Sequence, residues 1–546
     1  MAQQLNDHSL KQISSSYLDS LDAGELLHLS KNLLHDLKEA RERLNQNSSN
    51  SSRPPSNRPP WEDLPEKKGE IGSQPSSSVV IPKDEATSPE EKTSGAEKIA
   101  TPPPVEAAVA KKPSGRKPGK QLGAPGHGRT WHPTITQHIR HQSECCAACG
   151  AKFNEQTLYV AYSAFDSIDL QWGCRKTPGV TVEVTRHALT ESHCVCAHIT
   201  RSVPYRKNST MYPSVEVTEW RLIGPNLASL IVHLRLRWRL SVRRTQELLD
   251  EVLGIPLSVG ALQQCYEEVA AGAEPLDDTL VQELIGDVVG DGPTASTDVL
   301  HIDETSWKEG PLRLWLWVFV SRQTVCFWIG YRTKEILENV LGATFSGWIM
   351  SDGYQAYRSY LNRFRCWAHL LRKARGLAES LDVEGSTFGH QVLTLLGLLQ
   401  TAIYVWRDAN PGEKTETEAL AAKFAQEIEE FRRQCLAASR SKHEKTAALA
   451  KEFMNDWDVI FRLLRYPWMP LTNNEAERAL RHWVILRKIT HGTKSENGSR
   501  ALALLASITA TCRLRNASSL AYLAELIKAA RIGDALPPLP PKCVGV

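Results

Sequence analysis

The hydrophobic and polar positions of the chain form their clearest pattern after Val299, where short apolar runs alternate with polar turns. Strand-like runs start at Val299, Arg313 and Thr324, and each is rich in Val, Ile, Phe or Trp. The segment TKEILENVLG then has helical spacing, and another strand-like run, GWIMSDGY, starts at Gly347. This order of three strands, a helix and a fourth strand predicts a mixed α/β sheet.

Two aspartates belong to these strands, Asp303 near the end of the first and Asp352 at the end of the fourth. In a ribonuclease-H-like sheet the two strands lie side by side, so the carboxylates can converge. Converging carboxylates raise one another's pKa unless a cation neutralises them, and Mg²⁺ prefers such oxygens. We therefore predict a site for two Mg²⁺ or Mn²⁺ ions that supports in-line displacement at phosphorus.

A third acid for this site follows a long helical stretch from about Leu370 to Leu464. In the segment PLTNNEAERALRHWVILRK, Asn473 and Asn474 can open and cap a helix whose first turn carries Glu477. Each acid alone would be read as a surface charge, but their placement in this order favours a metal site. The same helix offers cations for phosphate contact, namely Arg478, Arg481, Arg487 and Lys488.

The region from Gly224 to about Leu280 has the composition of helices. Its centre predicts a helix from Val242 to Leu253, a tight turn at Gly254, and a second helix after Ser258 as N-cap, which is the layout of a helix-turn-helix. Paired helices with a glycine turn are also common in all-α domains that bind no DNA. Around the start of the first of these helices, three cations recur every four residues, which predicts a basic stripe on one helical face. They are Arg235, Arg239 and Arg243.

Two pairs of cysteines lie in a strand-like region between about 130 and 210. Cys146 and Cys149 form a C-x-x-C knuckle, and Cys194 and Cys196 can close a tetrahedral zinc site. The second pair has irregular spacing, so His193 and His198 stay open as ligands. The alternative is that the cysteines are simply buried in a small β unit.

The N-terminal part predicts a helix followed by a linker. Residues 25–44 carry apolar positions at alternating spacings of three and four, which favours a short coiled coil or one amphipathic helix packed on its own domain. A Pro- and Ser-rich stretch follows that is too polar to bury a core. It ends in a run of cations without acids, including Lys117 and Lys120, which suits DNA phosphates but also a solubilising tail.

Composition adds few constraints. The 65 basic and 62 acidic residues of this 546-residue chain nearly cancel, so local clusters of charge matter more than the net charge of +3. The N-terminus lacks a signal pattern, and no stretch approaches the roughly 18 to 20 apolar residues that span a bilayer. We therefore expect an unexported protein with no membrane partner, whose twelve cysteines bind metal or lie buried rather than forming disulfides.

The motifs together resemble the DDE transposases of the insertion-sequence-sixty-six family. The likeness is carried by NSSNSSRPPS, GRKPGKQLGAPGHGR, CAACG, HIDET, SDGYQAY, CWAH and NNEAER. The resemblance implies magnesium-dependent cleavage and strand transfer of an insertion element, with Asp303, Asp352 and Glu477 as the catalytic acids. It leaves Glu475 as a rival to Glu477, and it makes His369 an active-site neighbour, although a lone histidine is equally compatible with a structural role.

We accordingly expect a multidomain α/β protein, with a ribonuclease-H-like catalytic domain that contains a helical insertion. The expected parts are a coiled-coil helix (1–46), a disordered linker (47–128), a zinc-binding β unit (129–210), a helix-turn-helix-like domain (211–290), the catalytic domain (291–490, insertion about 375–465) and a C-terminal helical region (491–546). The expected setting is the nucleoid of the bacterial cytoplasm. The expected partners are double-stranded DNA at element ends and target, further copies of the chain, and accessory proteins of the same element. Two other functions keep this fold, a structure-specific nuclease and a DNA-binding regulator without chemistry.

Overall fold

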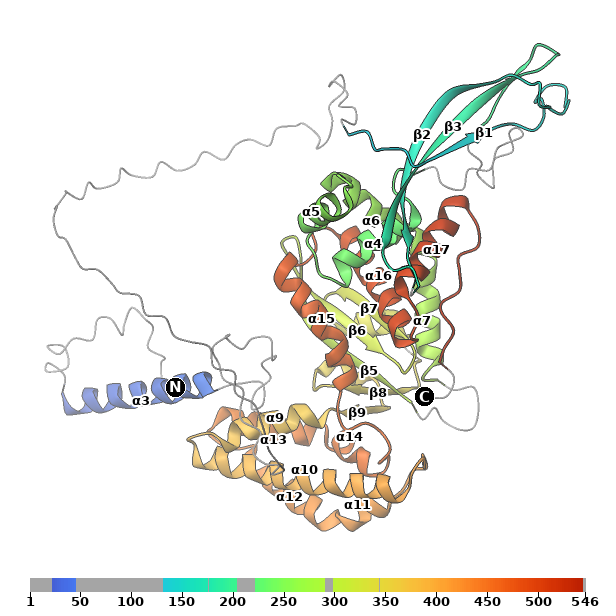
Figure 1. Cartoon of the computed structure of the whole chain (residues 1–546). Coiled ribbons are helices and arrows are strands. Elements are labelled where there is room, and N and C mark those ends of the chain that lie inside the picture. Colours follow the sequence, from blue (N-terminus) through green and yellow to red (C-terminus); the bar gives the residue numbers. More distant parts are fainter. Residues whose placement is uncertain are drawn as a thin grey trace, which may run out of the picture. The chain divides into compact units, whose positions relative to one another are not determined.

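The computed structural model describes residues 22–45, 131–174, 176–203, 221–289, 298–342 and 344–543 (Figure 1). The predicted linker, with Lys117 and Lys120, lies outside these residues. At the N-terminal side the chain forms helix α3 (Ala23–Asn45), as the leucine spacing predicts. The α3 leucines at 26, 33 and 37 are exposed by 37% or more.

The first sheet is built around a long hairpin. Strands β2 (Tyr159–Trp172) and β3 (Val180–His193) pair antiparallel over almost their whole length, while β1 (Gln137–His141) runs parallel to β3 and β4 (Ile199–Arg201) is antiparallel to it. Ile168 and Leu170 of β2 are fully buried, whereas several apolar side chains at the far end of the hairpin are exposed. These strands lie in the region between about 130 and 210 whose sequence is strand-like.

Helix α5 begins and ends where the sequence predicts, and α6 begins where it predicts. Helix α5 (Val242–Leu253) ends at Gly254, whose φ of 66° is left-handed, and α6 (Val259–Ala273) starts after Ser258, whose side chain accepts a hydrogen bond from the Ala261 N–H. The same region contains α4 (Pro225–Leu236) and α7 (Leu276–Gly286).

The predicted arginine stripe is wrong. Helix α4 ends at Leu236, so only Arg235 lies on it, while Arg239 sits in the connection with a φ of 61° and Arg243 lies on α5. A spacing of four places residues on one face only where the helix is continuous. Here it breaks between the first and second arginine, and the three cations do not share a face.

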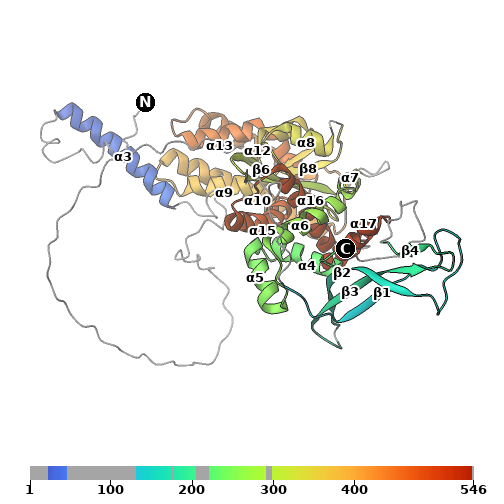
Figure 2. The ribbon, with the colours of Figure 1, turned by 90° about the horizontal axis from the view of Figure 1, so that it is seen from above.

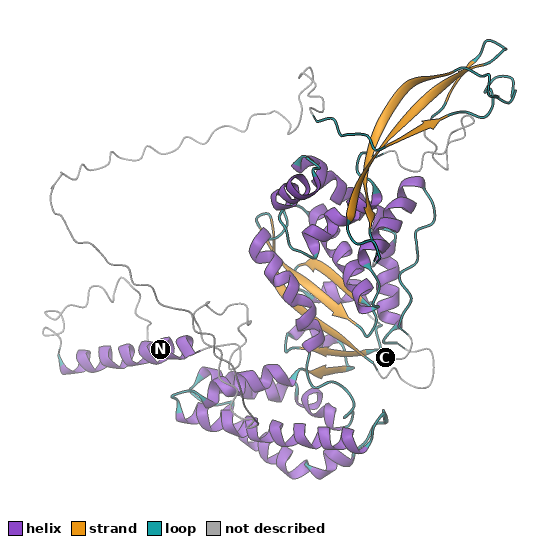
Figure 3. Cartoon of the chain, viewed as in Figure 1, coloured by secondary structure: helices purple, strands orange, loops and turns teal. Residues whose placement is uncertain are grey.

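The second sheet has the strand order β7-β6-β5-β8-β9 (Figures 1 and 3). Strands β5, β6 and β7 are antiparallel, whereas β8 and β9 run parallel to β5. The order of strands and helix along the chain confirms the prediction, and β5 and β8 are neighbours as expected. The bounds are β5 (Val299–Glu309), β6 (Leu312–Val320), β7 (Val325–Gly330), α8 (Lys334–Leu341), β8 (Trp348–Ser351), the short 3-10 helix η2 (Gln355–Ser359) and β9 (Arg363–Arg365).

C-terminal helices cover this sheet. Helix α15 (Asn474–Thr490) packs on β5, and α16 (Glu496–Leu514) packs on the edge strand β7, while α17 (Ser519–Ile532) packs on α4. The edge strand would leave backbone groups unpaired, but hydroxyls of α16 bond them. The Ser507 Oγ accepts the N–H of Phe327, and the Thr511 Oγ1 accepts the N–H of Val325.

A helical insertion separates β9 from α15, and Figure 3 shows it entirely as helices and loops. Its core is continuous with the sheet edge, because Met350 of β8 and Phe364 of β9 belong to the same buried cluster as its helices. Figure 2 shows the longer helices of the insertion side by side. The insertion comprises α9 (Trp367–Ala378), α10 (Val383–Ala409), α11 (Ala419–Lys423), α12 (Ala425–Ala438), α13 (Glu444–Asn455), α14 (Trp457–Phe461) and the 3-10 helix η3 (Arg462–Leu464).

Helix α10 corrects the expectation that no segment is apolar enough to cross a bilayer. It is, among the described residues, one helix that passes that test of length and composition. One face of the helix, with Phe388, Val392 and Leu396, is buried in the core of the insertion, whereas Leu398 and Val405 are exposed. A core helix of this kind has the same composition as a membrane span, so the composition alone decides nothing.

Candidate functional site

Asp303 and Asp352 come from neighbouring strands. The parallel pairing of β5 with β8 ends at His301 opposite Met350, so Asp303 lies two residues beyond it and Asp352 directly follows β8. The prediction that Asp303 stands near the end of its strand is wrong, because antiparallel pairing with β6 continues β5 to Glu309. Asp303 is therefore held in the middle of a rigid strand, which fixes its direction.

Asp303 is surrounded by other acids that disfavour its charge. Burial raises the pKa of Asp303 well above its usual range, and the nearby carboxylates of Glu304, Asp352 and Glu477 raise it further. Acids that disfavour one another's charge in this way need a cation, a proton or both to share one site. Asp352 and Glu477 thus lie close enough to Asp303 to disfavour its charge.

Glu477, on the first turn of α15, faces a histidine from the insertion. Its Oε1 lies 3.0 Å from the Nε2 of His369 on α9 and 4.0 Å from a guanidinium nitrogen of Arg372. Contact with His369 is the main reason that the pKa of Glu477 is lowered. Both facing atoms are buried, and neither has a well-formed hydrogen bond within the described residues. Together with the Cys366 sulfur they form a group whose ligand atoms lie within 4.8 Å of one another.

Asn473 attaches the start of α15 to β5. Its amide Nδ2 donates to the Ile302 carbonyl at 2.7 Å, and its Oδ1 accepts from the His301 ring at 3.0 Å. The prediction that Asn473 caps the helix is wrong in this respect, because the side chain bonds the strand and makes no cap hydrogen bond. The amide takes up the first β5 carbonyl beyond the β8 pairing, so the helix start replaces the missing strand partner.

The remaining polar residues of α15 divide into two groups. Arg487, which we expected to contact phosphate, donates instead to the Thr305 Oγ1 at 3.1 Å and the Ser306 Oγ at 2.8 Å, so it holds the far end of α15 on β5. Arg478 is exposed and pairs at 2.9 Å with Glu475, which is exposed too. Arg481 and Lys488 are also exposed.

Sequence reasoning missed Glu304, which is the next acid after Asp303. Its side chain is 1% exposed and receives the Arg332 guanidinium at 2.6 Å and the Tyr357 hydroxyl at 2.5 Å. Arg332 lies over the rings of Trp315 and Tyr354, at 4.4 and 4.0 Å from their centroids. The alternation of a β-strand turns Glu304 to the face opposite Asp303, and this period of two was the available signal.

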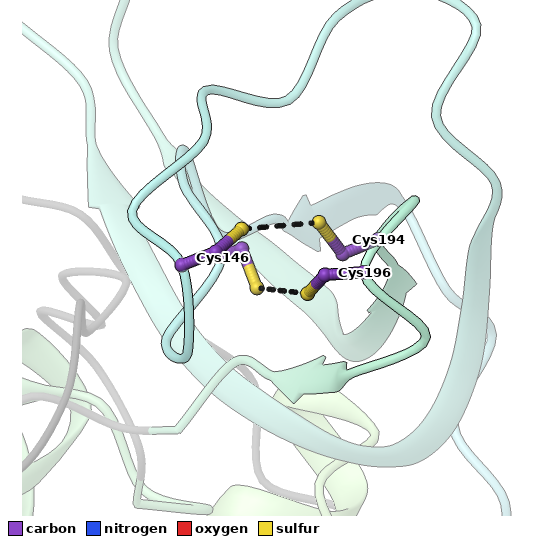
Figure 4. Close-up of side chains that lie close together, drawn as sticks. Cys146, Cys194 and Cys196 are labelled. Carbon is purple, nitrogen blue, oxygen red and sulfur yellow. Dashed lines mark hydrogen bonds between the residues drawn. The ribbon is translucent and has the colours of Figure 1, made fainter.

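The four predicted cysteines come together at the far end of the hairpin (Figure 4). The sulfurs of Cys146 and Cys196 are 3.7 Å apart, and those of Cys149 and Cys194 are 3.5 Å apart. A tetrahedral zinc with Zn–S bonds of about 2.3 Å needs sulfurs separated by roughly 3.8 Å. Cys146, Cys149, Cys194 and Cys196 could therefore hold a metal, and neither His193 nor His198 belongs to this group.

The charge state of this cluster also favours a cation. Hydrogen bonds from the backbone of Cys149 and Ala148 contribute to a pKa of about 6 for Cys146. The Cys196 backbone favours the Cys194 thiolate, yet burial and the neighbouring sulfurs raise the pKa of Cys194 to about 12. Four thiolates cannot coexist here without a positive ion.

A cluster of cations lies where the sequence did not place it. Arg237, Arg239 and Arg513 each disfavour the charge of the half-buried His482, which bonds the Leu236 carbonyl at 2.6 Å. After burial, the nearby Arg513 and Arg239 are what lowers the pKa of Arg237. Arg235 does not join this group, since its guanidinium lies 4.0 Å over the Tyr266 ring.

Comparison with known proteins gives two matches. A family model described as Transposase IS66 family matches residues 221–501, which is more than half of the chain. A protein of Sinorhizobium fredii (strain NBRC 101917 / NGR234), named Uncharacterized protein y4qI, is 27% identical over 197 residues. That stretch covers 34% of this chain and 36% of the relative, so the chain spans about a third of the relative's length. The family match includes the second sheet, the insertion and α15.

Proposed function

Because the chain belongs to the Transposase IS66 family, we propose that it is a DNA transposase whose Asp303, Asp352 and Glu477 direct metal-dependent cleavage and strand transfer. The observation that carries this proposal is that Asp352, directly after β8, and Glu477 of α15 both raise the pKa of the buried Asp303 on β5. The sheet order β7-β6-β5-β8-β9, with three antiparallel strands followed by two parallel ones, supports a ribonuclease-H-like catalytic domain.

The residues fit a hard divalent ion. Asp303 and Asp352 supply carboxylate oxygens, and Glu477 adds a buried Oε1 without a well-formed hydrogen bond within the described residues. Oxygen ligands of this kind suit Mg²⁺ or Mn²⁺. Bound ions of this class would activate the attacking oxygen and stabilise the leaving oxygen at phosphorus. Glu475 fits less well, since it is exposed and paired with Arg478.

Protein side chains supply the remaining parts of the site. His369 holds the Glu477 carboxylate from the insertion side, while Asn473 and Arg487 fix its helix on β5. The exposed Arg481 and Lys488 of the same helix are suited to contact the phosphates of a DNA strand near the acids. In this arrangement, the insertion and the sheet each contribute to the placement of Glu477.

Further proposals concern binding. The cysteine group of the hairpin would hold one structural Zn²⁺, and the α4 to α6 region with its cations would contact double-stranded DNA. The exposed leucines of α3 support pairing with a second copy of the chain. We place this activity in the bacterial cytoplasm, on the DNA of the insertion element and its target, with room for accessory proteins of that element.

The test is strand transfer by purified protein with Mg²⁺ and DNA carrying the ends of its element. We expect Asp303→Asn and Asp352→Asn to abolish cleavage and joining but to retain end binding, because only ion placement is lost. Glu475→Gln is the matched control and should stay active. Wild-type rates in either aspartate variant would refute the assignment. Cleavage without joining would indicate a nuclease, and binding without either reaction would indicate a regulator.

A further inference from the structure

The turn that carries Asp352 rests on a cluster of charges shared by the sheet edge and the insertion. Arg365 of β9 is fully buried and contacts Glu452 of α13, and its Nε lies 3.1 Å from Asp456 at the end of that helix. Asp456 is 1% exposed. The other members of the cluster are Arg358, Arg363 and Lys373. Buried charges are costly unless paired, so the partners must stay in place together.

Arg365 fixes the chain on both sides of Asp352. On one side Ser351 pairs with Arg365 across β8 and β9, and its carbonyl accepts the Cys366 N–H at 2.9 Å. On the other side lies Gly353. A Cβ added there would lie 2.5 Å from the Arg365 Nη2 and 2.9 Å from the Glu452 Oε1.

Gly353 is needed for space rather than for backbone conformation. Its φ is not positive, so a side chain would be tolerated by the backbone itself. The Arg365–Glu452 ion pair occupies the space that a Cβ at Gly353 would need. The Asp352 carboxylate is further held by the Tyr354 N–H at 2.8 Å. The direction of Asp352 therefore depends on where Arg365 and Glu452 lie.

We infer that Arg365 and Glu452 are positioning residues for Asp352, so that the insertion helps to build the metal site. This inference rests on the proposed function. Glu452 itself is held by Lys373, whose Nζ lies 2.7 Å from its second oxygen, and its helix α13 packs in the core of the insertion through Ala450 and Phe453. The core of the insertion thus fixes the position of α13. Glu452 on α13 fixes the side chain of Arg365, and Arg365 in turn supports the turn that carries Asp352.

If the Arg365–Glu452 ion pair had only a structural role, a different result would be expected. Its loss would lower stability and leave the affinity for a divalent ion unchanged. Loss of a positioning pair displaces a ligand, and outer partners of metal ligands typically contribute about 10- to 100-fold to affinity. Affinity for Mn²⁺, measured without any DNA reaction, separates the two.

The experiment titrates full-length, zinc-loaded protein with Mn²⁺ and measures free Mn²⁺ by electron paramagnetic resonance. Gly353→Ala and Glu452→Gln should each raise the half-saturating Mn²⁺ concentration by about 10- to 100-fold. The matched control is Glu283→Gln, which removes another ion pair with a buried arginine, Arg515. It should bind Mn²⁺ as the wild type does. Asp352→Asn identifies the signal of this site.

The outcomes are distinct. If the wild type binds no Mn²⁺ that Asp352→Asn removes, the proposed metal site fails and the inference falls with it. If the wild type binds and Glu452→Gln binds equally tightly, the inference alone is overturned. Should Gly353→Ala fail to fold, the near-isosteric Glu452→Gln decides, judged against Glu283→Gln for any loss of thermal stability.

Discussion

Replacement of Asn473 by alanine tests how α15 is attached to the sheet. The change removes the donor to the Ile302 carbonyl and the acceptor for the His301 ring, and Asn473 is fully buried. An unsatisfied buried polar group costs about 1 to 3 kcal/mol, so the two together cost about 2 to 6 kcal/mol. Even a loss of about 2 kcal/mol corresponds to a fall of about 4 °C in the thermal midpoint of a domain of roughly 200 residues.

Differential scanning calorimetry measures this midpoint, with Asn474→Ala as the control. Asn474 is the neighbouring residue, exposed at the first position of α15, so its loss should cost less than about 0.5 kcal/mol. Asn473→Asp should be worse than Asn473→Ala at neutral pH, because it keeps the shape but sets a carboxylate oxygen against the Ile302 carbonyl. An Asn473→Ala protein that melts with the wild type, or an equal loss in Asn474→Ala, would refute the attachment.

Three further outcomes are expected. Burial and the adjacent imidazole of His141 lower the pKa of His187 to about 4 from an ordinary 6.5, so the unfolded chain takes up the proton first. The stability that neutral His187 contributes is fully present above about pH 6.5 and is lost as the pH falls toward 4. His187→Phe should remove this pH dependence of the thermal midpoint, measured at constant zinc content. Cys149→Ser should lose about one zinc per chain by metal analysis, whereas Cys174→Ser, outside the cluster, should keep it. Arg513→Gln should lower the salt slope of duplex binding by about one, and the exposed Arg433→Gln should not.

Local patterns in the sequence were sufficient for the elements and insufficient for their contacts. Apolar runs and caps predicted β5 to β8 and the turn at Gly254, because these depend on residues close in the chain. The arginine stripe failed because α4 ends at Leu236, whose carbonyl bonds the distant His482, and spacing alone does not reveal such an end. The partners of Asn473 and Arg365 lie far along the chain, so only the fold could identify them.

The same contacts explain how a long insertion can separate two acids that must meet. Glu477 follows the insertion, yet its helix is fixed on β5 at both ends, by Asn473 and by Arg487. Its placement relative to Asp303 on the same strand therefore depends on β5 more than on the length of chain in between. The insertion nevertheless contacts the site at two places. His369 contacts Glu477, and Glu452 lies next to Gly353, the residue after Asp352. A loop of the same length without these helices would connect the strands but leave Asp352 and Glu477 without their supports.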